Sequence, residues 1–243
     1  MALSLNQQKR IAALHRKKGR DQQGLFLVEG HKSIRDFIAA GWRLGQGFCT
    51  EDSPMRSAKD FTTASTTELK SISTLDGPTD AVAVFEKQEL KPQGAGPVLV
   101  LDRIQDPGNA GALLRLADWF GIAYVAWPSG TVEPWNPKVV QASMGALARI
   151  PLIQQPAEDF ISQFQEEGRA IVVADMGGQA PDDAFVNGEN VALVMGNEGQ
   201  GPDATWSQAA QSIVTIPRAK GRQTESLNVA TAAAILLYVI ANG

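Results

Sequence analysis

The sequence is poor in the residues that form disulfides and metal sites. Its 243 residues include one cysteine, Cys49, and two histidines, His15 and His31. A single cysteine excludes an intramolecular disulfide and fits a reducing compartment. So few sulfur and imidazole ligands also leave no set that suits a structural zinc ion. We therefore expect neither redox chemistry nor a bound metal.

Long hydrophobic runs are also missing. The longest one, residues 229–241, is interrupted by Thr231, and it is shorter than the ~18 residues that a membrane-spanning helix needs. The first 30 residues contain six basic side chains and no apolar stretch behind them, which is unlike a secretory signal. The sequence thus predicts a cytoplasmic protein without a membrane segment, and 44% apolar residues are enough for a folded core.

Charge is distributed unevenly along the chain. The formal net charge is −4, but residues 1–90 carry +2, residues 91–243 carry −6, and residues 9–43 alone carry +6. A basic segment on an acidic protein favours a polyanionic partner such as a nucleic acid. An alternative stays open, because cations near the end of a helix also interact favourably with its terminal carbonyl groups. Charge alone does not decide between the two.

Residues 1–90 predict a small α/β domain. Its expected elements are a helix over about 6–18 ending at Gly19, a strand at 25–28, a helix over 31–41, a loop at 62–67 and a strand at 80–85. The stretch KQELKPQGAGP at 87–97 contains two prolines and two glycines without a periodic apolar face. Such composition indicates a boundary, and we place the linker at residues 91–97.

Residues 98–243 predict a second domain built on a parallel sheet. Short apolar runs alternate with segments of helical length, as expected for strands buried on both faces of an α/β sheet. Ligands bind such sheets at the carboxyl ends of the strands. The expected strands are 98–101, 124–127, 170–174, 191–195 and 212–216.

The loop after the first of these strands suggests an anion site. Asn109 stands where a helix N-cap is expected, and the helix that follows has an apolar stripe. Arg115 points away from that stripe, one turn above backbone N–H groups that favour an anion. Asn109 alone is ordinarily a cap and Arg115 alone a solvated residue, so the indication comes from their combination. The stripe consists of Leu113, Leu116, Ala117 and Phe120.

Two later loops carry further candidate residues. The strand at 191–195 is followed by GNEGQGP, whose glycines permit close approach of a ligand and which contains Glu198. This loop matches neither the Rossmann nor the Walker A pattern. The third loop runs from Ile216 through a basic stretch into a final helix that we expect from Ser226 onward. Ser226 and Asn228 are candidate caps of that helix, and its expected apolar stripe is Leu227, Ala230, Ala234 and Leu237.

Together these motifs resemble the SpoU (TrmH-type) RNA ribose methyltransferases of the SPOUT superfamily. The resemblance rests on Asn109-x-Gly111-x-x-x-Arg115, on LVMGNEGQG at 193–201, and on IP followed by SLNVA at 226–230. The segment QASMGALARIPL at 141–152 is similar to the family's intervening segment. Residues 9–34 are similar to a substrate-binding domain that many members carry. The resemblance thus covers nearly the whole chain, although residues 218–225 form a longer spacer than is common in the family.

The resemblance implies a SPOUT α/β domain with a C-terminal deep trefoil knot, bound S-adenosylmethionine, a homodimer, and methyl transfer to a ribose 2′-OH of RNA. rRNA is favoured as the substrate. Carried over by motif, the catalytic set is Arg115, Asn109, Glu198, Ser226 and Asn228. The cofactor set is Met195, Gly196, Ile216 and Leu227. The basic residues expected to contact RNA are Arg16, Lys17, Lys18, Arg20, Arg218, Lys220 and Arg222.

Three alternatives remain beside this interpretation. A tRNA substrate is possible within the same family. A non-catalytic RNA-binding paralogue belongs to a different class, and the intact set of motif residues argues against it. A nicotinamide-dependent Rossmann enzyme is disfavoured because the glycine fingerprint is missing.

Overall fold

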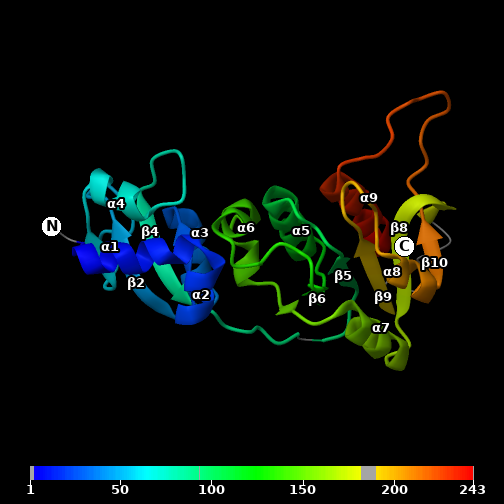
Figure 1. The fold of residues 1–243 in the computed structure, drawn as a ribbon, viewed down its shortest axis with the longest axis horizontal. Helices are drawn as coiled ribbons and strands as arrows, with labels where there is room; N and C mark the ends of the chain where they lie inside the picture. The colour runs from blue at the N-terminus through cyan, green and yellow to red at the C-terminus, as the bar shows by residue number, and fades with distance from the viewer. Residues whose placement is uncertain (1–2, 93, 182–189, 243) are drawn as a thin grey trace. The chain divides into compact units, whose positions relative to one another are not determined.

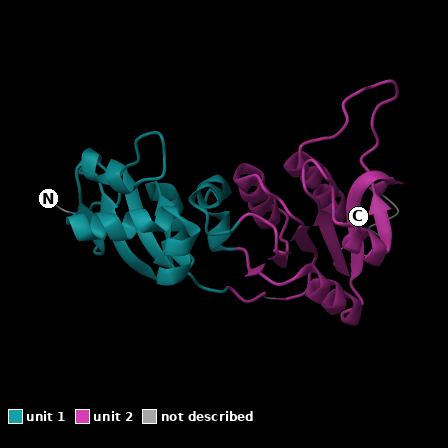
Figure 2. Cartoon of the chain, in the orientation of Figure 1, with its two compact units in different colours: residues 1–89, 133–149 teal, residues 90–132, 150–243 magenta. Residues whose placement is uncertain are grey.

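The computed structural model describes residues 3–92, 94–181 and 190–242. The chain divides into two compact units, shown in teal and magenta in Figure 2. The first unit comprises residues 1–89 and 133–149, and the second comprises residues 90–132 and 150–243. Each unit contains its own sheet.

A four-stranded sheet forms the centre of the first unit (Figure 1). Its order is β1-β4-β2-β3, in which β4 is antiparallel to both neighbours and β3 is parallel to β2. The strands are β1 (Leu25–Glu29), β2 (Leu44–Cys49), β3 (Phe61–Thr63) and β4 (Ala81–Glu86). The helices of the unit are α1 (Leu5–Ala12), α2 (Lys17–Gln23), α3 (His31–Ala39), α4 (Thr66–Ile72) and α6 (Pro137–Ser143).

The helix expected over 6–18 begins where expected, but its length and its end at Gly19 are wrong. Helix α1 ends at Ala12, a 3₁₀ turn follows at Ala13–His15, and α2 begins at Lys17. Gly19 does not end a helix but lies within α2, where a β-carbon would come within 2.0 Å of the Ala13 carbonyl oxygen. The glycine therefore lets α2 fold back closely on the preceding turn. As a consequence, Lys17 and Lys18 lie in the first turn of α2, so the helix-end explanation for their charge does not apply.

The segment 62–67 is also more structured than expected. It contains most of β3 and the start of α4, which Ser65 caps in a reciprocal arrangement with Glu68. The Ser-x-x-Glu spacing is a recognised sequence signal for a helix start. Loop-like composition hid that signal. The strand expected at 80–85 and the helix expected over 31–41 are present with small shifts, as β4 and α3.

A six-stranded parallel sheet forms the centre of the second unit, as expected. Its order is β10-β8-β9-β5-β6-β7, and each neighbouring pair is parallel. The strands are β5 (Val98–Leu101), β6 (Tyr124–Ala126), β7 (Leu152–Ile153), β8 (Ala170–Gln179), β9 (Val191–Met195) and β10 (Ser212–Val214). Only β7 lacks a counterpart in the expected set of strands, because two residues are too few to give a pattern.

Helices cover this sheet. The unit contains α5 (Pro107–Trp119), α7 (Ala157–Glu166), α8 (Ala204–Ala209) and α9 (Val229–Asn242). Phe160 and Phe164 of α7 and Trp206 of α8 pack with alternate residues of the central strands in one core. Every residue of β5 and β9 is buried, so the centre of the sheet is covered on both faces. Helix α5 packs against α9.

The segment 133–149 packs in the first unit, although we expected residues 98–243 to form one domain. The Trp135 ring lies 4.7 Å from that of Phe26 in β1, centroid to centroid. The Trp42 indole nitrogen donates to the Ala148 carbonyl oxygen at 2.9 Å. These contacts bury aromatic area of the kind that dominates core energetics. The structural division therefore differs from the one drawn through the linker at 91–97.

Within the described part of the chain, every helix is too short or too polar to cross a bilayer.

Candidate functional site

The candidate site is built where strands β5 and β9 end beside each other. The two strands pair in parallel from Val98 with Ala192 to Leu101 with Met195. The pairing continues one step further, since the Asp102 N–H donates to the Met195 carbonyl oxygen at 2.9 Å. The loops that follow therefore start from adjacent positions. This is the edge at which α/β sheets bind ligands.

The first loop leads into α5, but its cap is not the expected one. Asp106, not Asn109, occupies the N-cap, and its Oδ1 accepts the Asn109 N–H at 2.8 Å. Pro107 follows at the first helical position, where a missing N–H is harmless. Asn109 thus sits in the first turn of the helix with its amide group available for other contacts.

Hydrogen bonds join three of the predicted catalytic residues. The Asn109 Nδ2 donates to Glu198 Oε1 at 2.9 Å, and the Asn228 Nδ2 donates to Asn109 Oδ1 at 2.9 Å. Asn109 lies in the first turn of α5, Glu198 in the loop after β9 and Asn228 at the end of the loop after β10, up to 119 positions apart in the sequence. We call Asn109, Glu198 and Asn228 the motif triad. Glu198 and Asn228 are exposed and Asn109 is half-buried, so polar atoms of the triad beyond those used in these bonds remain open to solvent.

The third loop runs from β10 to α9 and appears as the long orange segment in Figure 1. Residues 217–228 are exposed, and α9 begins at Val229 rather than at Ser226. Asn228 caps the helix, because its Oδ1 accepts the N–H groups of Ala230 and Thr231. The expected apolar stripe is misplaced, and only Leu237 of it is buried. The buried residues of α9 are Val229, Ala233, Leu236, Leu237 and Ile240.

The loop after β9 is a tight turn held by side-chain hydrogen bonds. The Asn197 Oδ1 accepts the N–H groups of Gly199 and Gln200, each at 3.0 Å. At the far end, the Gly201 N–H returns to the Asn197 carbonyl oxygen at 2.9 Å. We call residues 197–201 the Glu198 turn. It presents the Glu198 carboxylate outward and ends beside Asp203, which caps α8.

Arg115 and Ser226 are placed without direct contact to the motif triad. Arg115 is exposed on α5 and faces away from the buried residues Leu113 and Ala117, as expected. The other two positions of the expected stripe, Leu116 and Phe120, are half-buried. Among the described residues, the side chains of Arg115 and Ser226 make no hydrogen bond or ion pair. The guanidinium is thus available to a ligand.

The predicted cofactor residues differ in exposure. Met195 and Gly196 are buried at the end of β9, and Ile216 is half-buried after β10. Leu227 is 48% exposed, so a large apolar side chain faces solvent beside the polar triad. Apolar walls next to backbone groups suit the binding of an adenine ring. These residues fit S-adenosylmethionine in chemical character, with the half-buried Ile216 and exposed Leu227 as apolar surface.

One of the seven residues predicted to contact RNA is unavailable. Arg20 is 2% exposed, and its guanidinium forms an ion pair with Glu133 and donates to the Leu14 carbonyl oxygen at 2.8 Å. Its burial makes Arg20 a structural residue of the first unit. Lys17 is exposed but pairs with Asp21 at 2.6 Å. The predicted residues that remain exposed without a carboxylate partner among the described residues are Arg16, Lys18, Arg218, Lys220 and Arg222.

Local contacts shift several titrating groups. Hydrogen bonds from the Thr205 hydroxyl and N–H lower the pKa of Asp203, which stays ionised beside Arg103. Burial raises the pKa of Cys49, so its thiol is a poor nucleophile at neutral pH. Within the described ranges, no group of three or more His, Cys, Asp or Glu side chains is arranged to hold a metal ion.

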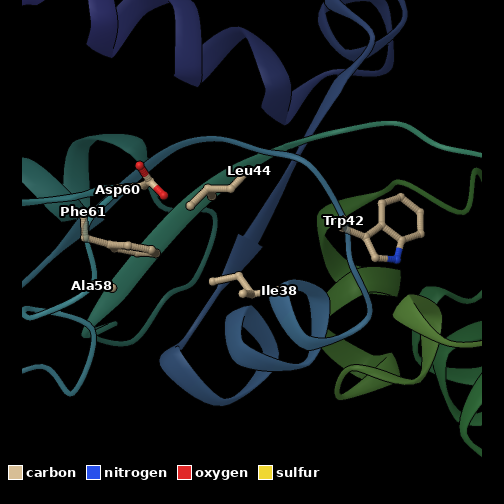
Figure 3. Close-up of a pocket in the computed structure, with 6 residues that line it drawn as sticks. All are labelled: Ile38, Trp42, Leu44, Ala58, Asp60 and Phe61. Carbon is tan, nitrogen blue, oxygen red and sulfur yellow. The ribbon is translucent and has the colours of Figure 1, made fainter.

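A hollow in the first unit contains none of the predicted site residues. It has a volume of about 360 Å³ and is lined by Ile38, Trp42, Leu44, Ala58, Asp60 and Phe61 (Figure 3). The Phe61 ring lies against Gly47, where a β-carbon would come within 2.6 Å of it. Five of the six lining residues are apolar.

Comparison with known families decides the classification. The model of the SpoU rRNA Methylase family matches residues 96–238. The chain belongs to the SpoU rRNA methylase family. The model of the MRM3-like substrate binding domain matches residues 6–83 of this family member. The family expected from the three motifs is therefore confirmed.

Relatives of this SpoU-family chain cover almost all of it. It is 29% identical to the 23S rRNA (guanosine(2553)-2′-O)-methyltransferase RlmP of Bacillus subtilis, over 93% of this chain and 92% of the relative. A TrmH-family protein from Porphyromonas gingivalis superposes with a TM-score of 0.88 at 34% identity, covering 99% and 98% of the two chains. An AdoMet-bound rRNA methyltransferase from Sinorhizobium meliloti superposes with a TM-score of 0.86 at 27% identity, covering 99% and 96%.

Sequence reasoning missed the residues that hold the loops together. Asp102, Arg103 and Asn197 bind backbone groups across the two strand ends. A polar pair directly after a buried strand is a weak signal for such a role. Nothing in the local sequence shows which main-chain atoms these side chains reach.

Proposed function

We propose that this protein transfers a methyl group from S-adenosylmethionine to a ribose 2′-OH of rRNA. The observation that carries the proposal is the motif triad, in which Asn109, Glu198 and Asn228 from three separate loops are hydrogen bonded at the carboxyl edge of the sheet. The rRNA methyltransferase names of the Bacillus and Sinorhizobium proteins support rRNA over tRNA.

S-adenosylmethionine would be held by Met195, Gly196, Ile216 and Leu227, and when bound it supplies an electrophilic methyl group. Holding donor and hydroxyl in line contributes more than any single group in such a transfer, since orientation is worth roughly 7 to 11 kcal/mol. The triad supplies that rigidity in the proposed site. Its bonds fix the three loops relative to one another before substrate binds.

Arg115 has the role of a phosphate clamp and a charge stabiliser. A guanidinium is a hydrogen-bond donor that offers no lone pair at neutral pH, so it is unsuited to take the proton of the hydroxyl. Its five donors match a phosphate bidentately and stabilise the negative charge that develops on the ribose oxygen. A phosphate oxygen or a water molecule accepts the proton.

Arg115→Lys tests this role, because lysine keeps the charge and loses the fork. We expect the single-turnover rate on rRNA to fall by about 10², with S-adenosylmethionine affinity by calorimetry unchanged. A rate near that of the unmodified protein would contradict the clamp.

The first unit has the role of RNA recognition, for which the match to a substrate-binding domain over residues 6–83 is the support. Arg16, Lys17 and Lys18 are the proposed phosphate contacts there, while Arg218, Lys220 and Arg222 add basic charge in the loop before α9. Neutralising the first three together should weaken RNA binding and reduce the slope of log affinity against log salt. An unchanged slope would show that these three residues do not contact RNA phosphates.

The remaining expectations concern assembly and topology. Exposed apolar side chains on α5 and α9, namely Trp119, Ile235 and Tyr238, favour a homodimer. Tyr238→Glu should lower the mass measured by sedimentation equilibrium from that of a dimer to that of a monomer. An unchanged dimer would place the interface elsewhere.

A C-terminal trefoil knot is part of the same proposal. Its support is that the chain leaves the edge strand β10 and returns to pack α9 against α5, which follows the central strand β5. In single-molecule pulling, a knotted chain unfolds to a contour length shorter than that of the full extended sequence. A full-length extension would exclude the knot.

The cytoplasm is the compartment we propose, because both RNA and S-adenosylmethionine are present there.

A further inference from the structure

Arg103 occupies an unfavourable backbone conformation beside the site. Its φ is 53°, in the left-handed region, and apart from glycines only Met144 shares this property among the described residues. A residue with a β-carbon pays for such a conformation, so the surrounding contacts must hold it there. Strain of this kind is concentrated at functional sites.

Both ends of the Glu198 turn are held by this one residue. At the start, the Asn197 Nδ2 donates to the Arg103 carbonyl oxygen at 2.9 Å. At the end, the Arg103 Nη2 donates to the Gly201 carbonyl oxygen at 3.2 Å. In this left-handed conformation, the Arg103 carbonyl group binds the start of the Glu198 turn and the Arg103 side chain binds its end.

Two carboxylates orient the guanidinium. Asp102 is 2% exposed, and its Oδ2 accepts both the Arg103 Nε at 3.3 Å and the Asp203 N–H at 2.7 Å. The Asp203 Oδ2 lies 3.4 Å from the Arg103 Nη1. A planar fork with donors in fixed directions reaches these acceptors and the Gly201 carbonyl together, which a lysine ammonium cannot do.

We propose that Arg103 is a positioning residue for methyl transfer. It fixes the turn that carries Glu198, and through the Glu198–Asn109 hydrogen bond it fixes the motif triad, without itself touching substrate. The inference rests on the proposed function of the triad and adds a residue outside the three motifs.

A double-mutant cycle with Glu198 tests the inference. Arg103→Ala should lower the single-turnover methylation rate by about 10², the effect of misplacing a reacting group by about 1 Å. In a Glu198→Ala background the same substitution should change the rate by less than about threefold, because the group that Arg103 positions is already absent. Equal fold losses in both backgrounds would overturn the proposal.

Arg169→Ala is a matched control. Arg169 also donates to two carbonyl oxygens, those of Gly96 at 2.8 Å and Val191 at 3.4 Å, and to the Glu167 carboxylate. These contacts lie at the amino ends of the strands, away from the motif loops. Both alanine variants should lower the thermal midpoint, but only Arg103→Ala should lower the methylation rate. Arg103→Lys should recover part of the thermal loss and little of the rate.

Amide hydrogen exchange measures how firmly the Glu198 turn is held, independently of methylation activity. Exchange at Gly199 and Gln200 should accelerate in Arg103→Ala and stay unchanged in Arg169→Ala, and unchanged exchange in Arg103→Ala would overturn the proposal. Failure of the proposed function would have a different signature. The unmodified protein would then bind no S-adenosylmethionine and methylate no rRNA, whatever the exchange at these amides.

Discussion

Gly196 gives the sharpest test of the cofactor loop. It joins β9 to the Glu198 turn, and a β-carbon built there would lie 2.1 Å from the Pro202 nitrogen and 2.5 Å from the Gly201 carbonyl carbon. Ordinary contact begins at 3.4 Å, so the opposing backbone would have to retreat by about 1.3 Å. A shift of about that size at a reacting centre lowers rates by ~10²-fold. Gly196→Ala should therefore reduce both S-adenosylmethionine affinity and the single-turnover rate by about 10².

Gly199→Ala is the matched control for that experiment. It lies in the same loop, but its added β-carbon would meet only the Asn197 Oδ1, at an ordinary 3.7 Å. We expect cofactor affinity and rate within about threefold of the unmodified protein, since surface changes of this kind move free energies by ~0.5 kcal/mol. Calorimetry and single-turnover methylation measure both quantities. Equal behaviour of the two variants would refute the claim that the close backbone approach at Gly196 shapes the cofactor site.

Two further predictions concern the first unit. Arg20→Ala should lower the free energy of unfolding in urea by roughly 2 to 4 kcal/mol, because it leaves the mostly buried Glu133 carboxylate short of donors. Lys18→Ala, at an exposed position, should change the same free energy by less than ~0.5 kcal/mol. Similar losses in the two variants would refute the structural role of Arg20. Asp21→Asn should cost less than ~1 kcal/mol at pH 6, since the ion pair is exposed. Hydrogen bonds from Lys17 and Lys87 lower the pKa of Asp21 to about 2. The contribution is therefore fully present above pH 3.8 and is lost as the pH falls through about 2, and a difference from the unmodified protein that stayed undiminished at pH 2 would contradict it.

The strands of the second unit could be predicted because their chemistry is local. A strand buried on both faces has to be apolar along its whole length, so runs such as Val98–Leu101 and Val191–Met195 stand out from a single sequence. Helix boundaries in the first unit could not be predicted in the same way. A glycine such as Gly19 is typical of a helix end. Here it lies inside α2, because the Ala13 carbonyl group packs against it and leaves no room for a β-carbon.

The site divides along the same line. Motif spacing identified Asn109, Glu198 and Asn228, and the structure joins them by hydrogen bonds across loops that are far apart in sequence. The roles of their neighbours depend on contacts that no spacing reveals. Asp106 took the cap that Asn109 was expected to fill, because proline at the first helical position sets the helix start one residue after Asp106.

The basic residues show most clearly that sequence alone does not reveal which charges are exposed. Lys18 and Arg20 are two residues apart and equally basic in the sequence, yet Lys18 is exposed while Arg20 is buried against Glu133, 113 positions away. Burial converts a candidate RNA contact into an internal ion pair that holds segment 133–149 in the first unit. That segment lies within the part of the chain matched by the methylase family, residues 96–238. Composition therefore locates the linker at 91–97. It does not show that segment 133–149, which contains the Arg20 partner Glu133, packs with the first unit.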